Sequence, residues 1–124
     1  MSFEKLDVYK VAVELRATVT RAIAKQGSRN LRDQFARASS SIILNTAEGA
    51  GRWGAADKRH FYLIARGSAF ETAAALTLLR AESALTAAQY ATAKQLAIRV
   101  MAMLTNLAKR PVPVPITTDQ EPGR

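Results

Sequence analysis

The sequence predicts an all-α protein, an antiparallel up-down-up-down four-helix bundle. Apolar residues recur three and four positions apart in four successive segments, and no segment alternates with the period of two that strands require. The connections between these segments are short, which favours antiparallel neighbours. With 124 residues and 48% hydrophobic residues, the chain fits one domain that can bury a core. Cysteine is absent, so disulfides, thiolate zinc sites and cysteine catalysis are excluded.

The first two helices are predicted over about residues 4–25 and 29–48. Gly27 is the expected stop of the first, and Ser28 or Asn30 is the expected cap of the second. The apolar seam of the first helix reads Val8, Ala12, Leu15, Val19 and Ala22. That of the second reads Leu31, Phe35, Ala38, Ile42 and Asn45. The glycines that follow are expected to end the second helix.

The third and fourth helices are predicted over about residues 55–83 and 87–109. Gly54 occupies the N-cap position of the third helix. The expected apolar face of the third helix is Phe61, Ile64, Ala65, Phe70, Ala75, Leu76 and Leu79, and that of the fourth is Ala93, Leu96, Ala97, Val100, Met103, Leu104 and Leu107. All four prolines follow residue 110, so residues 1–110 form the bundle and residues 111–124 a Pro-rich, disordered tail.

Several apolar residues remain outside these seams. A second apolar stripe on a small bundle is typical of a partner surface, and a symmetric homo-oligomer is the simplest partner. We therefore predict an oligomer interface at Ile43, Leu44, Tyr62, Ile98 and Met101.

The charge points to an anionic partner. The chain carries 18 Lys and Arg against 10 Asp and Glu, a net charge of +8. The stretch 49–54 is expected to be a turn rather than a phosphate loop, because it follows a helix and lacks the Lys-Ser/Thr ending. Next to it, the start of the third helix favours anions, and the neighbouring indole could stack on a base. The predicted nucleic-acid contacts are Arg52, Trp53, Lys58, Arg59, Arg37, Arg21 and Lys25. The alternative is a solvated surface with a packed tryptophan.

A buried polar network is the second predicted site. Folding the chain back about residue 53 brings Arg37 near Ser68 and Glu71, and Asn45 can bond to backbone. The expected members are Asn45, Glu48, Ser68, Glu71 and Arg37. Paired carboxylates can instead form an acid–base or di-metal site, but di-metal bundles use Glu-x-x-His pairs, and His60 does not follow a glutamate in that way. We expect no metal, no cofactor and no enzymatic activity.

Three stretches together resemble a known bacterial family. They are Phe3-Glu-Lys-Leu6-x-Val8-Tyr9-x-x-Ala12, then Gln34-x-x-Arg37-Ala38-x-x-Ser41-Ile42-x-x-Asn45-x-Ala47-Glu48-Gly49-x-Gly51-Arg52, and Phe61-x-x-Ile64-Ala65-Arg66-Gly67-Ser68-x-x-Glu71. The family consists of four-helix-bundle proteins encoded in intervening sequences of 23S ribosomal RNA genes, and it includes the accessory variability determinant of diversity-generating retroelements. The resemblance implies a homopentameric ring or barrel and, for the retroelement member, a basic nucleic-acid-binding partner of a reverse transcriptase. The chain departs from the family pattern at Ala36, Ile43, Leu44, Thr46 and Gly54.

These observations predict a non-enzymatic, basic, oligomeric bundle that binds RNA or DNA through the phosphate backbone. The alternative is a protein-interaction scaffold that does not touch nucleic acid. Glu4, Asp7 and Glu14 interrupt the first apolar segment, and no window approaches 18 consecutive apolar residues. A cytoplasmic bacterial protein without membrane contact is therefore expected.

Overall fold

Four α-helices form the fold. A computed structural model describes residues 6–110 and contains α1 (Asp7–Ala22), α2 (Arg29–Gly51), α3 (Ala55–Ala81) and α4 (Ala87–Ala108), with no strand in this range. The predicted all-α class and the predicted number of helices are confirmed. The tail predicted over residues 111–124 lies outside the described residues.

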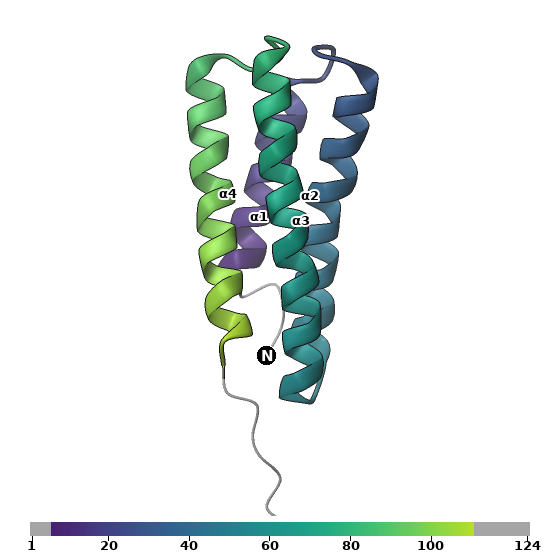
Figure 1. Ribbon diagram of the computed structural model, residues 1–124, viewed down its shortest axis with the longest axis vertical. Coiled ribbons are helices and arrows are strands. Elements are labelled where there is room, and N and C mark those ends of the chain that lie inside the picture. Colours follow the sequence, from purple (N-terminus) through teal and green to yellow (C-terminus); the bar gives the residue numbers. More distant parts are fainter. Residues whose placement is uncertain (1–5, 111–124) are drawn as a thin grey trace, which may run out of the picture.

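The helices lie side by side around one core (Figure 1). Each packs against its neighbour along the chain, and α4 also packs against α1. Across residues 6–110, the backbones of α1 and α3, and those of α2 and α4, do not approach closely, so these pairs lie diagonally across the bundle. The links α1–α2 and α3–α4 lie at one end of the molecule, and the short turn between α2 and α3 lies at the other (Figure 1). We call the latter the turn end.

Side chains cap the N-termini of α2 and α4, whereas the N-caps of α1 and α3, Leu6 and Gly54, make no side-chain cap bond. The Ser28 hydroxyl accepts a hydrogen bond from the amide of Leu31 at 3.2 Å, which decides between the two predicted caps of α2. Thr86 and Gln89 form a reciprocal capping box at the start of α4. Gly27 follows α1 with φ of 75°, a backbone conformation that glycine adopts without steric cost.

The second helix is longer than predicted, because it continues through Gly49 and ends at Gly51. Gly49 does not break the helix; its missing side chain lets α3 approach. A Cβ placed there would lie 2.8 Å from Cε1 of Tyr62. The glycine is therefore a packing residue of the α2–α3 contact.

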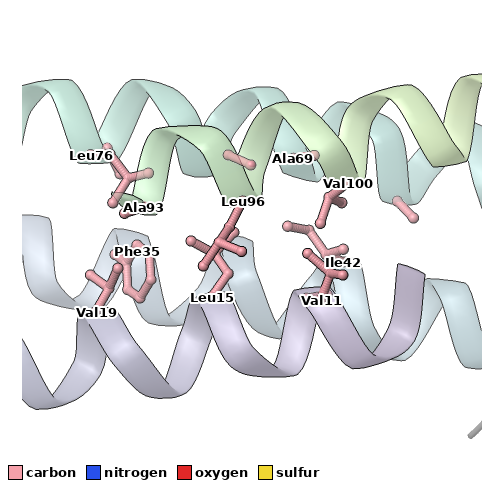
Figure 2. Packing of buried hydrophobic residues seen from close by; sticks show 14 of the residues in the cluster. Val11, Leu15, Val19, Phe35, Ile42, Ala69, Leu76, Ala93, Leu96 and Val100 are labelled. Carbon is pink, nitrogen blue, oxygen red and sulfur yellow. The ribbon is translucent and has the colours of Figure 1, made fainter. Parts of the chain in front are cut away.

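The core draws large aliphatic and aromatic side chains from all four helices (Figure 2). Phe35 is its largest fully buried side chain. Others buried with it are Leu15, Val19, Ile42, Leu76, Leu79, Val100 and Leu104. Burial of each such side chain contributes about 1.5–3 kcal/mol relative to exposure, so this layer supplies most of the driving force for folding.

The predicted apolar face of α3 is partly wrong. Ile64 is 40% exposed and Phe70 is 50% exposed, so these two residues point away from the core. The face that packs inward is formed instead by small or polar residues together with a few large ones: Tyr62, Ala65, Ser68, Ala69, Thr72, Ala75, Leu76 and Leu79. Small side chains allow two neighbouring helices to approach α3 closely, and several of its larger side chains lie on the outside.

One buried hydroxyl has no partner. Thr46 is fully buried in α2, and its Oγ1 makes no hydrogen bond to any described residue. Replacing Thr46 with valine, which has the same shape, is expected to raise the free energy of unfolding by about 1–2 kcal/mol, because an unpaired buried hydroxyl is costly. Circular dichroism can monitor thermal unfolding of the variant. The midpoint temperature should rise by about 4–8 °C for each kcal/mol gained in the free energy of unfolding.

Thr72 provides the matched control. It is also fully buried, but its Oγ1 donates to the Ser68 carbonyl oxygen at 2.8 Å. Thr72→Val should therefore lower stability by about 0.5–1.5 kcal/mol. Equal effects of the two substitutions would contradict the assignment of Thr46 as an unpaired hydroxyl.

Candidate nucleic-acid interface

The tip of the turn end carries an indole that packs against nothing. Arg52, Trp53 and Gly54 connect α2 to α3, and Trp53 is 99% exposed. The expected alternative of a packed tryptophan is therefore excluded for the single chain. A side chain of this size in full contact with water is available to stack on another flat group.

Arg52 is held by two groups beside the tip. Its Nη2 lies 2.8 Å from Oε2 of Glu48, and its guanidinium carbon lies 4.6 Å from the centre of the Phe61 ring. Both members of the ion pair are largely exposed, so the pair contributes little to stability. Glu48 therefore belongs to this surface pair and not to the buried network in which it was predicted.

Lys58 secures the turn itself. Its Nζ donates to the carbonyl oxygens of Gly49 at 3.3 Å and Ala50 at 2.9 Å. These carbonyls lie in the last turn of α2, where helical partners are missing and positive charge is favoured. Lys58 thus acts first as a structural cap, and only part of its charge is available to an outside anion.

Arg59 lies with three cations that the sequence analysis did not select. It lines a cavity of about 440 Å³ between α3 and α4, together with Arg66, Lys109 and Arg110. One available signal was the seven-residue spacing of Arg59 and Arg66, which places both on the same side of a helix. The proximity of Lys109 and Arg110 depends on how α4 packs against α3, which no local pattern encodes.

Burial raises the pKa of the Tyr62 phenol, while the neighbouring Arg110 guanidinium acts to lower it.

The other predicted contacts lie elsewhere. Arg21 is in the last turn of α1 and Lys25 is in the link that follows, at the end of the molecule opposite the turn end (Figure 1). Arg37 is exposed along α2 and lines a cleft with Gln34, Ser41 and Glu71. The structure therefore brings Arg52, Trp53, Lys58 and Arg59 to one end and leaves the remaining three away from it.

A part-buried hydrogen-bonded cluster contains two of the five residues of the predicted network, Asn45 and Ser68. Asn45 Nδ2 donates to the backbone carbonyl of Ser41 at 2.9 Å, as expected of a bond to backbone, and to the Ser41 hydroxyl at 3.0 Å. That hydroxyl is 2.7 Å from the Ser68 hydroxyl, which links α2 to α3. Arg37 and Glu71 line the same cleft, but the described residues hold no ion pair between them. Ser41 is the member that the prediction missed.

The predicted oligomer residues divide by exposure. Leu44 is 68% exposed and Ile98 is 43% exposed, so both are available to a partner. Ile43 and Met101 are half-buried against the core of their own chain. Tyr62 is buried against Gly49, so it stabilises the single bundle and is not part of an outer surface.

Three apolar residues of α3 that were not predicted as interface residues are exposed on its outer side. Leu63, Phe70 and Leu78 are each 45–50% exposed and recur every seven or eight residues. This spacing places them along one outer line of the helix. We call these three residues the α3 row.

Two kinds of feature are absent from the described part of the chain. Among residues 6–110, no helix is long and apolar enough to cross a membrane. The same range contains no group of three or more His, Asp or Glu side chains placed to hold a metal ion.

The fold and this surface define a class: a small basic α-helical protein whose cations gather beside an exposed tryptophan at one end of four packed helices. Within that class, the chain belongs to the 23S rRNA-intervening sequence protein family, whose model matches residues 4–106. No curated protein matches the chain.

A crystal structure from Bacteroides thetaiotaomicron has a similar fold. It is described as a protein of unknown function from the S23 ribosomal protein family. The two are 23% identical, with a TM-score of 0.75, over 82% of this chain and 98% of the other. At this identity the likeness establishes the shared helical fold alone.

Proposed function

We propose that the protein is a non-enzymatic bundle that binds RNA or DNA through phosphate groups at the turn end. The observation that carries the proposal is Trp53, 99% exposed between Arg52 and Gly54 and close to the cations of α3. Aromatic stacking on an unpaired base is worth about 1–3 kcal/mol, and neighbouring cations bind the phosphates on either side. Such a surface favours single-stranded segments over a regular duplex.

The proposed assembly is an up-down-up-down bundle that forms a homopentameric ring or barrel in the cytoplasm. The α3 row, Leu44 and Ile98 support the presence of a partner surface, because exposed apolar side chains of this size favour association. A relation to the accessory variability determinant of retroelements, and thus to a reverse transcriptase partner, is part of the same proposal.

Binding is expected to depend steeply on salt. Each neutralised phosphate releases counterions, so affinity for a fluorescein-labelled single-stranded RNA should fall by orders of magnitude between about 50 and 200 mM salt. Arg59→Gln should reduce the slope of log affinity against log salt by about one and weaken all sequences alike. Fluorescence anisotropy measures both quantities. The pair Arg21→Gln and Lys25→Gln, at the opposite end of the molecule, is the control and should leave the slope unchanged.

Trp53 offers a second readout because it is the sole tryptophan of the chain. Stacking on a base should quench its emission, and Trp53→Ala should weaken single-stranded binding by about 5–150-fold. Absence of binding to both single-stranded RNA and duplex DNA at low salt would refute the proposal.

A protein-interaction scaffold is the second candidate, and the α3 row is the observation that favours it. A pull-down that recovers one protein at fixed stoichiometry and survives nuclease treatment would support the scaffold. Loss of the recovered protein after nuclease treatment would instead support binding through nucleic acid.

A further inference from the structure

The cavity between α3 and α4 concentrates positive charge. Its charged lining consists of Arg59, Arg66, Lys109 and Arg110, and its volume is about 440 Å³. Among the described residues no acidic side chain lines it, although Arg110 also borders a second pocket that Asp7 lines. The sequence of α4 contains no Asp or Glu, and α3 has none from residue 58 to residue 70. Four like charges around one cavity repel one another, and an anion placed among them would remove that repulsion.

Simple helix electrostatics explains only half of this arrangement. Lys109 and Arg110 follow the C-terminal end of α4, where the helix dipole favours cations. Arg59 and Arg66 lie in the first half of α3, where no such benefit exists. The helix dipole therefore does not account for their position beside Lys109 and Arg110.

Arg66 is held in place by a hydrogen bond and by an aromatic ring. Its Nε donates to Oγ1 of Thr105 at 2.7 Å, and that hydroxyl donates to the Met101 carbonyl at 2.8 Å. Its guanidinium carbon also lies 5.0 Å from the centre of the Phe70 ring. Among the described residues these contacts leave both terminal nitrogens without a hydrogen-bond partner. A planar guanidinium fixed in this way can offer them to two oxygens of one phosphate.

The cavity is larger than a bare phosphate requires and has an apolar part. Leu63 and Ala108 contribute to its lining beside the cations. Its volume falls within the range of about 300–1,000 Å³ that is typical of small-molecule sites. A sugar or base on the apolar part and a phosphate among the cations would use both kinds of lining.

We propose that this cavity is a binding subsite for a nucleotide phosphate, with the phosphate held by Arg66, Lys109 and Arg110. The inference rests on the proposed nucleic-acid function and specifies where one phosphate of the ligand is bound. The phosphate can be a monoester at the end of a strand or a diester within it, and both present the same oxygens to the site.

The test uses the full chain and adenosine 5′-monophosphate as the probe, with adenosine as the ligand that lacks the phosphate. Two-dimensional NMR should show saturable shifts of the Thr105 amide and the Arg66 Nε–H with the nucleotide and not with adenosine. Lys109→Gln with Arg110→Gln should weaken nucleotide binding by about tenfold or more, because each charge-assisted contact is strong. Both residues follow α4, so the helices should stay intact in circular dichroism. Arg66→Gln, a separate variant, should weaken binding by a similar factor.

The control removes the same charge from the same helix. Lys94 and Arg99 are exposed on α4 and do not line the cavity. Lys94→Gln with Arg99→Gln should change nucleotide affinity by less than about twofold. If this pair weakens binding as much as Lys109→Gln with Arg110→Gln, net charge explains the effect and the subsite is overturned.

Oligonucleotides separate the remaining outcomes. A 5′-phosphorylated strand that binds more tightly than its 5′-hydroxyl form, with the difference lost in Lys109→Gln with Arg110→Gln, identifies a terminal phosphate. Equal binding that is weakened by this variant identifies an internal phosphate. A third outcome is that strands bind, and bind equally well to Lys109→Gln with Arg110→Gln, while neither the nucleotide nor inorganic phosphate shifts the cavity resonances. That outcome overturns the subsite and leaves the proposed nucleic-acid binding in place. If strands also fail to bind, the proposed function fails with it.

Discussion

Replacing Gly49 with alanine is expected to lower the free energy of unfolding by about 2 kcal/mol, even though alanine is the better helix former. Gly49 is buried, and an added Cβ would lie 2.8 Å from Cε1 of Tyr62 and 3.2 Å from Cβ of Phe61. Tyr62 is 5% exposed, so its ring cannot move without displacing its neighbours in the core. The Phe61 Cβ is attached directly to the backbone. Relief of the clash therefore requires α2 and α3 to separate.

Gly67 is the matched control for this substitution. It is exposed within α3, and no atom lies within 4 Å of the position where its Cβ would stand. Gly67→Ala should raise stability by about 0.5–1 kcal/mol, because it removes a flexible residue from a helix. Urea unfolding of the two variants should move the midpoint in opposite directions. A Gly49→Ala protein as stable as Gly67→Ala would show that the helices do not approach as closely as described.

The same glycine explains part of the motif around it. The Gly49 carbonyl accepts from the Arg52 amide at 3.2 Å and from Lys58 Nζ at 3.3 Å. Separation of α2 from α3 at this point would also displace the turn that carries Trp53. Stability and the position of the candidate interface are therefore linked through one close helix contact.

Local signals in the sequence predicted the helices well. The seams of α1 and α2 were right at Leu15, Phe35 and Ile42, and Ser28 was one of two proposed caps. These features depend on residues within a few positions of one another. The orientation of α3 was missed at Phe70 because periodicity identifies a face by its large residues, whereas α3 buries small ones against two partners.

The candidate site was predictable only where the chain itself brings residues together. One segment of eight residues, from the turn into the start of α3, contains Arg52, Trp53, Lys58 and Arg59. Their proximity in space therefore follows from their proximity in the chain. Arg21 lies away from this group, because α1 ends at the end of the molecule opposite the turn between α2 and α3. The Arg66 cavity requires the α3–α4 packing, which is a tertiary property.

Replacing Ala74 and Leu78 with glutamate is expected to dissociate the proposed pentamer into single chains of 13.5 kDa, about a fivefold fall in mass. Both residues are exposed on the outer side of α3, in line with Phe70. The α3 row extends over 16 residues from Leu63 to Leu78, about 22 Å along the helix, so it can form one side of an interface. Charge placed in a desolvated apolar contact is strongly unfavourable. Light scattering coupled to size exclusion measures the mass.

Both substituted residues lie outside the Arg66 cavity. Leu63 of the α3 row lines that cavity and Phe70 contacts Arg66, so nucleotide binding by the dissociated variant shows whether the cavity is complete within one chain. Thr92→Glu with Ala88→Glu adds the same charge to exposed positions of α4 and should keep the wild-type mass. A wild-type mass near 13.5 kDa would remove the assembly from the proposal. An unchanged mass of the Ala74→Glu, Leu78→Glu protein would place the interface away from the α3 row.

Dissociation should also weaken binding to long RNA more than binding to short RNA. Each chain carries a net charge of +8, and an assembly presents several turn ends to one strand. Linked sites gain avidity of about 10²–10⁴-fold over one site when the ligand spans them. A strand too short to reach a second chain gains nothing. Comparison of the two strand lengths therefore measures how much of the affinity belongs to a single turn end and how much to the assembly.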